Sequence, residues 1–146
     1  MITTLVVDAS VAAQWFVPDN NTAEALIVLQ HVPSLAAPEL LYAEVANTLW
    51  KRVQRSELTP TEADALFDAL MMVPVDTYPS SLVLPVAWEA ALRAGITVYD
   101  GLYVALAHHL QAPLVTADKR LYAQEHVLAH YAQLLWLADI RELLGL

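Results

Sequence analysis

The sequence contains no cysteine and only three glycines among its 146 residues. Without cysteine it forms no disulfide, no thiol nucleophile and no cysteine-bound zinc site, which is compatible with a reducing compartment. The glycines are Gly95, Gly101 and Gly145, so neither a GxGxxG dinucleotide motif nor a Walker phosphate loop can be built. Thiol chemistry and these two nucleotide-binding loops are therefore excluded.

Positive charge is scarce. Seven Lys and Arg stand against sixteen Asp and Glu, which gives a formal net charge of −9. A broad basic surface for nucleic acid is therefore absent, and any nucleic-acid binding must be local. The hydrophobic share of 58% predicts one domain over residues 1–146 with a full core. It is more than a monomer of this length needs, so we expect an apolar face that is buried in a homodimer or against a partner.

No long apolar run is present. The longest stretch without Asp, Glu, Lys or Arg covers residues 101–117, and it contains two histidines, a glutamine and a proline. This differs from a membrane span of about 20 apolar residues. The N-terminus shows no basic region followed by an apolar segment and a cleavage site. We therefore expect a cytoplasmic protein without a membrane segment.

Short apolar runs alternate with helical patterns along the chain. We expect strands at 2–7, 35–37, 73–77, 114–116 and 134–137, and helices at 10–16, 22–31, 38–54, 59–72, 82–94 and 100–111. This alternation predicts an α/β sandwich around a mainly parallel sheet of four or five strands. The helices at 38–54 and 59–72 form a helical hairpin. A mostly helical segment at 128–144 is the alternative for the last strand.

Three local signals mark helix ends. Pro38 is expected in the first turn of its helix, where a missing N–H has no partner to lose. Thr59 and Glu62 have the spacing of a capping box. Gly95 is expected to end a helix in the left-handed conformation.

Two acidic residues directly follow buried strands. Asp8 follows Leu5–Val7, and Asp118 follows the strand at 114–116 after one intervening residue. In an open parallel sheet, ligands bind outside the carboxyl ends of the strands, where the winding reverses. We therefore expect both carboxylates at one edge of the sheet.

Two further acids face inward from helices. Glu44 lies beside the core-facing stripe of its helix, and Asp100 shares a helical face with Tyr103. Four clustered acids repel one another unless they are protonated or bridged by cations. Oxygen ligands favour Mg²⁺ or Mn²⁺, which support phosphodiester hydrolysis by acidifying a bound water. Structural roles are the alternative, as helix caps for the three aspartates and as an ion-pair partner for Glu44.

Four sequence blocks that contain these acids together resemble the PIN-domain ribonucleases. The blocks are LVVDASV at 5–11, PELLYAEVAN at 38–47, YDGLYVALA at 99–107 and LVTADKRL at 114–121. In size and motifs the chain is most similar to the toxin subunit of VapBC-type toxin–antitoxin pairs. The clearest departure is Gly101, where Ala is more usual, and a glycine in a first helical turn is expected to cost little.

The resemblance implies a metal-dependent endoribonuclease that acts on RNA, commonly as a homodimer. It assigns metal binding and catalysis to an acidic quartet, namely Asp8, Glu44, Asp100 and Asp118. Ser10, Thr116 and Asn47 are the corresponding neighbours that orient ligands or water. A toxin implies a small antitoxin that places a cation, such as an arginine, among the acids. An RNA-processing nuclease outside a toxin system and a non-catalytic PIN-like binding module stay as alternatives.

Five cations are candidates for contact with RNA phosphates. They are Lys51, Arg52 and Arg55, late on the Glu44 helix, and Lys119 and Arg120, after Asp118. For the first three, ordinary solvation at a helix C-terminus is the alternative.

Overall fold

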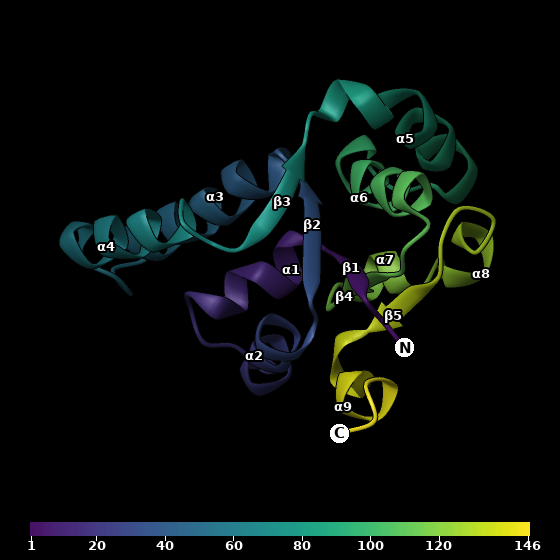
Figure 1. Cartoon of the computed structure of the whole chain (residues 1–146). Coiled ribbons are helices and arrows are strands. Elements are labelled where there is room, and N and C mark those ends of the chain that lie inside the picture. Colours follow the sequence, from purple (N-terminus) through teal and green to yellow (C-terminus); the bar gives the residue numbers. More distant parts are fainter.

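Five parallel strands form one sheet at the centre of the protein (Figure 1). The computed structural model describes all residues from Met1 to Leu146. The strands are β1 (Thr4–Val7), β2 (Ser34–Pro38), β3 (Val75–Tyr78), β4 (Leu114–Thr116) and β5 (Leu134–Trp136). They lie in the order β3-β2-β1-β4-β5. The predicted parallel α/β sheet is therefore confirmed, with five strands.

The chain begins in the middle of this sheet. Val6 of β1 lies beside Ala36 of β2 on one side and beside Leu114 of β4 on the other. β3 then extends the sheet beyond β2, and β5 extends it beyond β4. The winding therefore reverses between β1 and β4, which is where open parallel sheets bind ligands.

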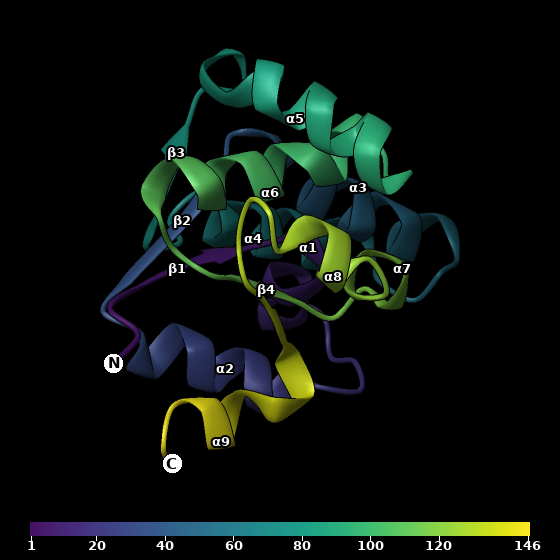
Figure 2. The ribbon, with the colours of Figure 1, turned by 90° about the vertical axis from the view of Figure 1, so that its right-hand side faces the viewer.

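Helices cover both faces of the sheet. They are α1 (Ala9–Ala12), η1 (Ala13–Trp15), α2 (Thr22–His31), α3 (Leu40–Gln54), α4 (Pro60–Leu70), α5 (Ser80–Ala94), α6 (Val98–Leu110), α7 (Lys119–Tyr122), α8 (Glu125–Leu128), η2 (Leu137–Asp139) and α9 (Ile140–Leu143). On one face α6 packs against β1, β2 and β4, and α5 lies outside α6 (Figure 2). The other face is covered by α1, α2 and α9. Since α6 has protein on both sides, every residue from 101 to 107 is buried.

The helical hairpin of α3 and α4 projects from the body of the protein (Figure 1). The structure confirms the Thr59–Glu62 capping box at the start of α4, with both reciprocal hydrogen bonds present. Only Leu70 of α4 is buried. Large apolar side chains of the hairpin and its exit stay exposed: Trp50, Phe67, Met71 and Met72. This exposed apolar surface agrees with the apolar face expected from the hydrophobic share of 58%.

Two expectations about element boundaries are wrong. Pro38 closes β2 beside Tyr78 instead of opening a helix. The next residue continues the pairing, because the Glu39 N–H donates to the Tyr78 carbonyl at 2.9 Å, and Pro38, which has no N–H, lies at the end of the strand. Helix α3 therefore begins only at Leu40. The mostly helical alternative for 128–144 is also wrong, because β5 pairs with β4 there.

No single helix is long and apolar enough to span a membrane. The pair α5 and α6 passes a combined test of length and composition, but the two helices are bent by 118°. Between them, Gly95 has a φ of 68° and ends α5 in the predicted left-handed conformation.

Helices α5 and α6 meet closely at Gly101. A Cβ added there would lie 2.6 Å from the backbone carbonyl oxygen of Ala87. We expect Gly101→Ala to lower the free energy of unfolding by about 1–3 kcal/mol, despite the higher helix propensity of alanine, because α5 must shift. Thermal unfolding measures this as a Tm that falls by roughly 3–10 °C. The sequence-based expectation that this glycine matters little is thereby replaced by a packing requirement.

Gly95→Ala is the control for this substitution. No atom lies within 4 Å of a Cβ at that position, so only the positive φ opposes the alanine there. A Gly101→Ala protein as stable as the unaltered chain would show that the two helices separate without loss.

Candidate active site

Four acidic residues lie at the carboxyl-end edge of the sheet or face it. Asp8 follows β1, and Asp118 lies two residues after the end of β4. Asp100 lies in the first turn of α6, and Glu44 lies on α3. Thr116 contacts both the Asp8 carboxylate and the Asp118 N–H, and Tyr103 of α6 contacts Glu44, so the acids lie around the β1/β4 reversal point.

The Asp8 carboxylate is buried and held from both sides. The Ser10 hydroxyl donates to Oδ1 at 2.5 Å, and the Thr116 hydroxyl donates to Oδ2 at 2.5 Å. The Val11 N–H also donates to Oδ1 at 3.3 Å, so Asp8 caps α1. Burial outweighs these hydrogen bonds and raises the pKa of Asp8 to about 7, with a smaller rise from the charge of Asp100.

The two hydroxyls are themselves fixed by the backbone. The Ala117 N–H donates to Ser10 Oγ at 2.9 Å, and the Asp118 N–H donates to Thr116 Oγ1 at 3.0 Å. The structure therefore places the Ser10 and Thr116 hydroxyls directly against Asp8. Together they tie the end of β1 to the end of β4.

Asp100 is half-buried among other acids. Burial raises its pKa to about 6, and the nearby charges of Asp118 and Glu44 contribute to the rise. Thr97 is the N-cap of α6, and its hydroxyl accepts from the Asp100 N–H at 3.0 Å. The alternative of a helix cap is therefore wrong for Asp100, because Thr97 is the N-cap, and a side-chain hydrogen bond with Thr97 opposes part of the rise in the pKa of Asp100.

Glu44 has a partner that sequence reasoning missed. The hydroxyl of Tyr103, a side chain that is only 1% exposed, donates to Glu44 Oε1 at 2.6 Å. Burial raises the pKa of Glu44 above its usual range, against the opposing effect of this hydrogen bond. The ion-pair alternative is wrong, because Glu44 takes part in none of the ion pairs. The signal for Tyr103 was its position one turn after Asp100 on the same helical face.

Asp118 combines a structural contact with its place among the acids. Its Oδ1 accepts from the Arg120 N–H at 2.8 Å and from the Leu121 N–H at 3.4 Å, so it caps α7. Capping is therefore compatible with a role in the site for Asp8 and for Asp118.

The donor set of this site consists of oxygen atoms alone. No three acidic or histidine side chains surround a common point closely enough to hold an ion as they stand. Asp8, Glu44 and Asp118 are instead turned to local hydrogen-bond donors. The carboxylates of Asp8, Glu44 and Asp100, whose pKa values are raised chiefly by burial, nevertheless have the chemistry that a hard divalent cation stabilises.

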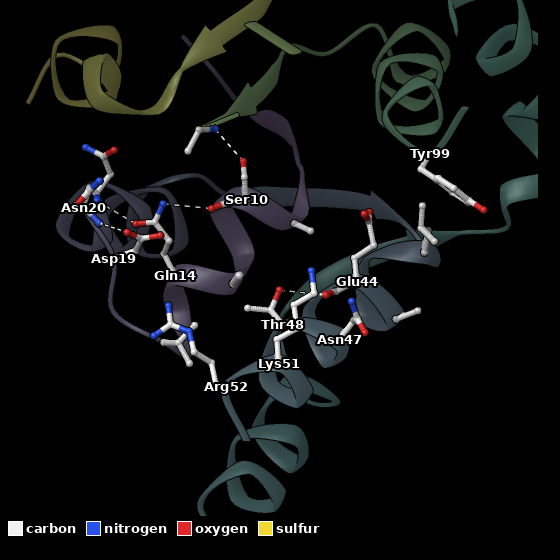
Figure 3. Close-up of a pocket in the computed structure, with 17 residues that line it drawn as sticks. Ser10, Gln14, Asp19, Asn20, Glu44, Asn47, Thr48, Lys51, Arg52 and Tyr99 are labelled. Carbon is white, nitrogen blue, oxygen red and sulfur yellow. Dashed lines mark hydrogen bonds between the residues drawn. The ribbon is translucent and has the colours of Figure 1, made fainter. Parts of the chain in front are cut away.

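A groove of about 580 Å³ extends from Glu44 along α3, and we call it the α3 groove. Its walls are formed by α1, η1 and the loop up to residue 21 on one side and by α3 on the other (Figure 3). Asn47, Thr48 and Lys51 face Gln14 and Asp19 across it. Gln14 was not predicted as a site residue. It is buried and its amide joins the Ser10 carbonyl to the Asn21 N–H.

Some of the predicted polar and basic residues line the α3 groove and others lie outside it. Asn47 lines it and is exposed, but the hydroxyl that reaches the Glu44 segment belongs to Thr48, which donates to the Glu44 carbonyl at 3.3 Å. Lys51 and Arg52 line the groove as well. The other three predicted cations are exposed and lie outside it: Arg55, Lys119 and Arg120.

Comparison with known proteins gives consistent matches. The family profile described as PIN domain matches residues 5–127. Ribonuclease VapC3 of Pyrobaculum aerophilum is 37% identical over 121 residues, which cover 80% of this chain and 91% of that protein. Ribonuclease VapC1 of Mycobacterium tuberculosis is 38% identical over 119 residues, covering 81% and 88%. The crystal structure of PAE2754 from Pyrobaculum aerophilum superimposes with a TM-score of 0.69 at 24% identity, covering 99% and 98%.

Proposed function

Because the chain belongs to the PIN domain family, we propose that it is an endoribonuclease that hydrolyses RNA phosphodiester bonds, and the toxin of a toxin–antitoxin pair. The observation that carries this proposal is the acidic neighbourhood at the β1/β4 reversal point, formed by Asp8, Glu44, Asp100 and Asp118. Ribonucleases named VapC at 37% and 38% identity support the same activity and the toxin role.

The four acids are proposed to hold Mg²⁺ or Mn²⁺. Burial opposes the ionisation of Asp8, Glu44 and Asp100, and a hard divalent cation bound among these like-charged oxygens would favour it. Bound there, the metal supplies Lewis acidity, which neutralises phosphate charge and makes a coordinated water more acidic. This also explains how a chain of net charge −9 accepts a polyanion at a cluster of acids.

The surrounding side chains orient these acids. Ser10 and Thr116 each donate to a different oxygen of Asp8, so its carboxylate plane is fixed. Tyr103 fixes Glu44 in the same way through Oε1, which leaves Oε2 for another partner. Such preorganisation keeps repelling carboxylates in one arrangement before RNA arrives.

Removing the Tyr103 hydroxyl tests this positioning. We expect Tyr103→Phe to lower kcat for RNA cleavage by about 10-fold, as for other residues that orient site ligands. KM should change little, because the buried ring does not line the α3 groove. Steady-state kinetics and a metal titration measure the effect, and an unchanged kcat contradicts the positioning role. Tyr131→Phe removes a similar hydroxyl, bonded to Glu89 at 2.7 Å outside the site, and is the control.

Exposed apolar surface supports the proposed protein partners. Trp50, Phe67, Met71 and Met72 on and beside the hairpin are exposed, and so is Trp88 on α5. We propose that a second copy of the chain and a small antitoxin cover parts of this surface. An antitoxin cation placed near Asp100 would neutralise the acids in place of a metal. A role on cellular RNA fits a cytoplasmic location.

The activity is tested with end-labelled structured RNAs and purified protein in Mg²⁺, Mn²⁺ or EDTA. We expect cuts at discrete positions with either metal and none in EDTA. Cleavage that persists in EDTA contradicts the metal dependence. Absence of cleavage for every RNA, together with no metal binding by calorimetry, contradicts the enzyme itself.

A further inference from the structure

The two edges of the sheet are protected to different degrees. β3 lies at one edge, where Pro74 and Pro79 flank it and the exposed Asp76 lies within it. Prolines and charges of this kind discourage the pairing of a further strand. β5 lies at the other edge, and its residues Leu134–Trp136 include no charge and no proline (Figure 1). The β5 edge is therefore open to another strand.

Part of the β5 backbone has no partner in the protein. The Leu114 N–H of β4 donates to the Gln133 carbonyl at 2.9 Å, so the backbone groups of residues 133 and 135 face β4. The N–H and C=O of Leu134 and the N–H of Trp136 therefore point away from the sheet, and no hydrogen bond outside the sheet satisfies them. Such groups can pair with an extended chain.

A hollow of about 380 Å³ lies beside this backbone, and we call it the β5 hollow. β5 lines it together with α7, α8, η2 and α9. Tyr122 and Trp136 supply its aromatic surface, with ring centroids 5.2 Å apart. The β5 hollow shares no residue with the α3 groove, so it is a separate surface of the protein.

The charges of the β5 hollow favour a cationic ligand. Glu125 and Asp139 line it, and no Lys or Arg does. A side-chain hydrogen bond with Glu125 is the largest effect that raises the pKa of Tyr122, and the charge of Asp139 is a smaller one, so both carboxylates lie near this side chain. The His126 side chain is 95% exposed at the rim. A lysine or arginine in the hollow would contact both carboxylates and the aromatic rings.

A second copy of the chain does not suit this edge. Pairing of β5 with itself about a two-fold axis brings the same surface of both copies together. Glu125 and Asp139 of one copy would then lie near those of the other, and the hollow has no Lys or Arg to offset their repulsion. The net charge of −9 opposes self-association further. Charge complementarity therefore favours a different protein with a basic segment.

We propose that an extended, basic segment of a partner protein pairs with β5 as a sixth strand and places a lysine or arginine in the β5 hollow. The backbone of the segment bonds to Leu134 and Trp136, and its cation lies between Glu125 and Asp139. Backbone pairing supplies affinity and the hollow supplies specificity. The inference goes beyond the proposed ribonuclease activity and does not depend on it.

Matched charge variants test the cation site. The probe is a fluorescent heptapeptide of alternating valine and lysine, and its counterpart has glutamate for lysine. We expect Glu125→Gln with Asp139→Asn to weaken binding of the basic peptide about 5-fold or more, measured by fluorescence anisotropy. Asp64→Asn with Asp68→Asn, at exposed acids of α4, changes the net charge equally and should leave the affinity within twofold. Equal effects of the two pairs, or equally tight binding of the glutamate peptide, overturn the proposal.

Backbone methylation tests the strand pairing. In an added strand, alternate residues turn their N–H groups towards the sheet. Two versions of the basic peptide carry N-methyl groups, one on every valine and the other on every lysine, and both keep the charge. We expect one version to lose binding and the other to retain it. Equal affinity of both versions shows that the peptide is held by charge alone, which contradicts a sixth strand.

Hydrogen exchange of the β5 amides identifies the occupant. We expect saturating basic peptide to slow the exchange of the Leu134 and Trp136 N–H groups at least about 10-fold, since both point away from β4. Exchange that is unchanged by the peptide contradicts docking at this edge. Exchange that slows with rising protein concentration in the absence of peptide would assign the edge to a second copy of the chain and overturn the proposal. RNA cleavage enters none of these measurements, so they stand or fall separately from the proposed activity.

Discussion

An Asp100→Asn protein is expected to cleave RNA at least about 100-fold more slowly than the unaltered chain, with an equal or higher Tm. Asp100 is the acid that nearby Asp118 and Glu44 oppose most directly. Asparagine has nearly the same shape but removes one negative ligand from the site. It also removes the repulsion, and the N-cap of α6 is Thr97, so the helix keeps its cap.

Substitution of Asp100 tests the acidic site better than substitution of Asp8, because Asp8 also has a structural role. In Asp8→Asn the new NH₂ group would face a hydroxyl that now donates to the carboxylate, either Ser10 or Thr116. We therefore expect Asp8→Asn to lose both activity and stability. Asp64→Asn, at an exposed acid of α4, is the matched control and should cleave like the unaltered chain. If Asp100→Asn cleaves within threefold of that control, the acidic quartet is not the active site.

The stability of the metal-free protein is expected to fall as the pH rises from about 4 to about 7. Asp8 has a pKa of about 7 in the folded state, against 3.8 for an unburied aspartate carboxyl. Between these values the folded chain keeps a proton that the unfolded chain releases, so the stabilisation is complete below pH 4 and lost above pH 7. The loss from this group is about 2–4 kcal/mol. Asp100, with a pKa of about 6, adds a loss in the same direction.

Denaturant titrations at several pH values in EDTA measure this effect. Asp8→Asn should flatten the dependence, because the titrating group is gone, whatever its absolute stability. Mg²⁺ should stabilise the unaltered chain more at pH 8 than at pH 5, since a cation binds the ionised acids. A metal-free protein whose stability rises steadily from pH 4 to pH 7 would show that Asp8 is not buried as described.

Patterns of short range made much of the fold predictable. The period of apolar residues located the five strands, and the Thr59–Glu62 box and Gly95 marked helix ends because caps depend on neighbouring residues. Asp8 and Asp118 were placed at one sheet edge by a rule about parallel sheets. The positions of these two acids could therefore be predicted from the order of strands and acids along the sequence.

Contacts between segments that are distant in the sequence could not be predicted from such local patterns. Pro38 looked like a helix start, but its pairing with β3 decided its conformation, and β3 is formed about 40 residues later. The Tyr103 hydroxyl contacts Glu44, 59 residues away in the sequence, and no local pattern in either segment predicts this contact. Gly101 appeared replaceable until the backbone of α5 was placed 2.6 Å from its Cβ position.

The pairing of β1 with β4 sets when the proposed site can form during the synthesis of the chain. Asp8 is among the first residues made, but the Thr116 hydroxyl and Asp118 are added about 110 residues later. Ribosomes add about 5–20 residues per second, so roughly 5–20 seconds separate the two halves of the site. A nascent chain holds its first strand without the neighbour that completes the acidic cluster. With the proposed site, the nascent chain stays inactive at least until Asp118, at the start of the last fifth of the sequence, has been translated.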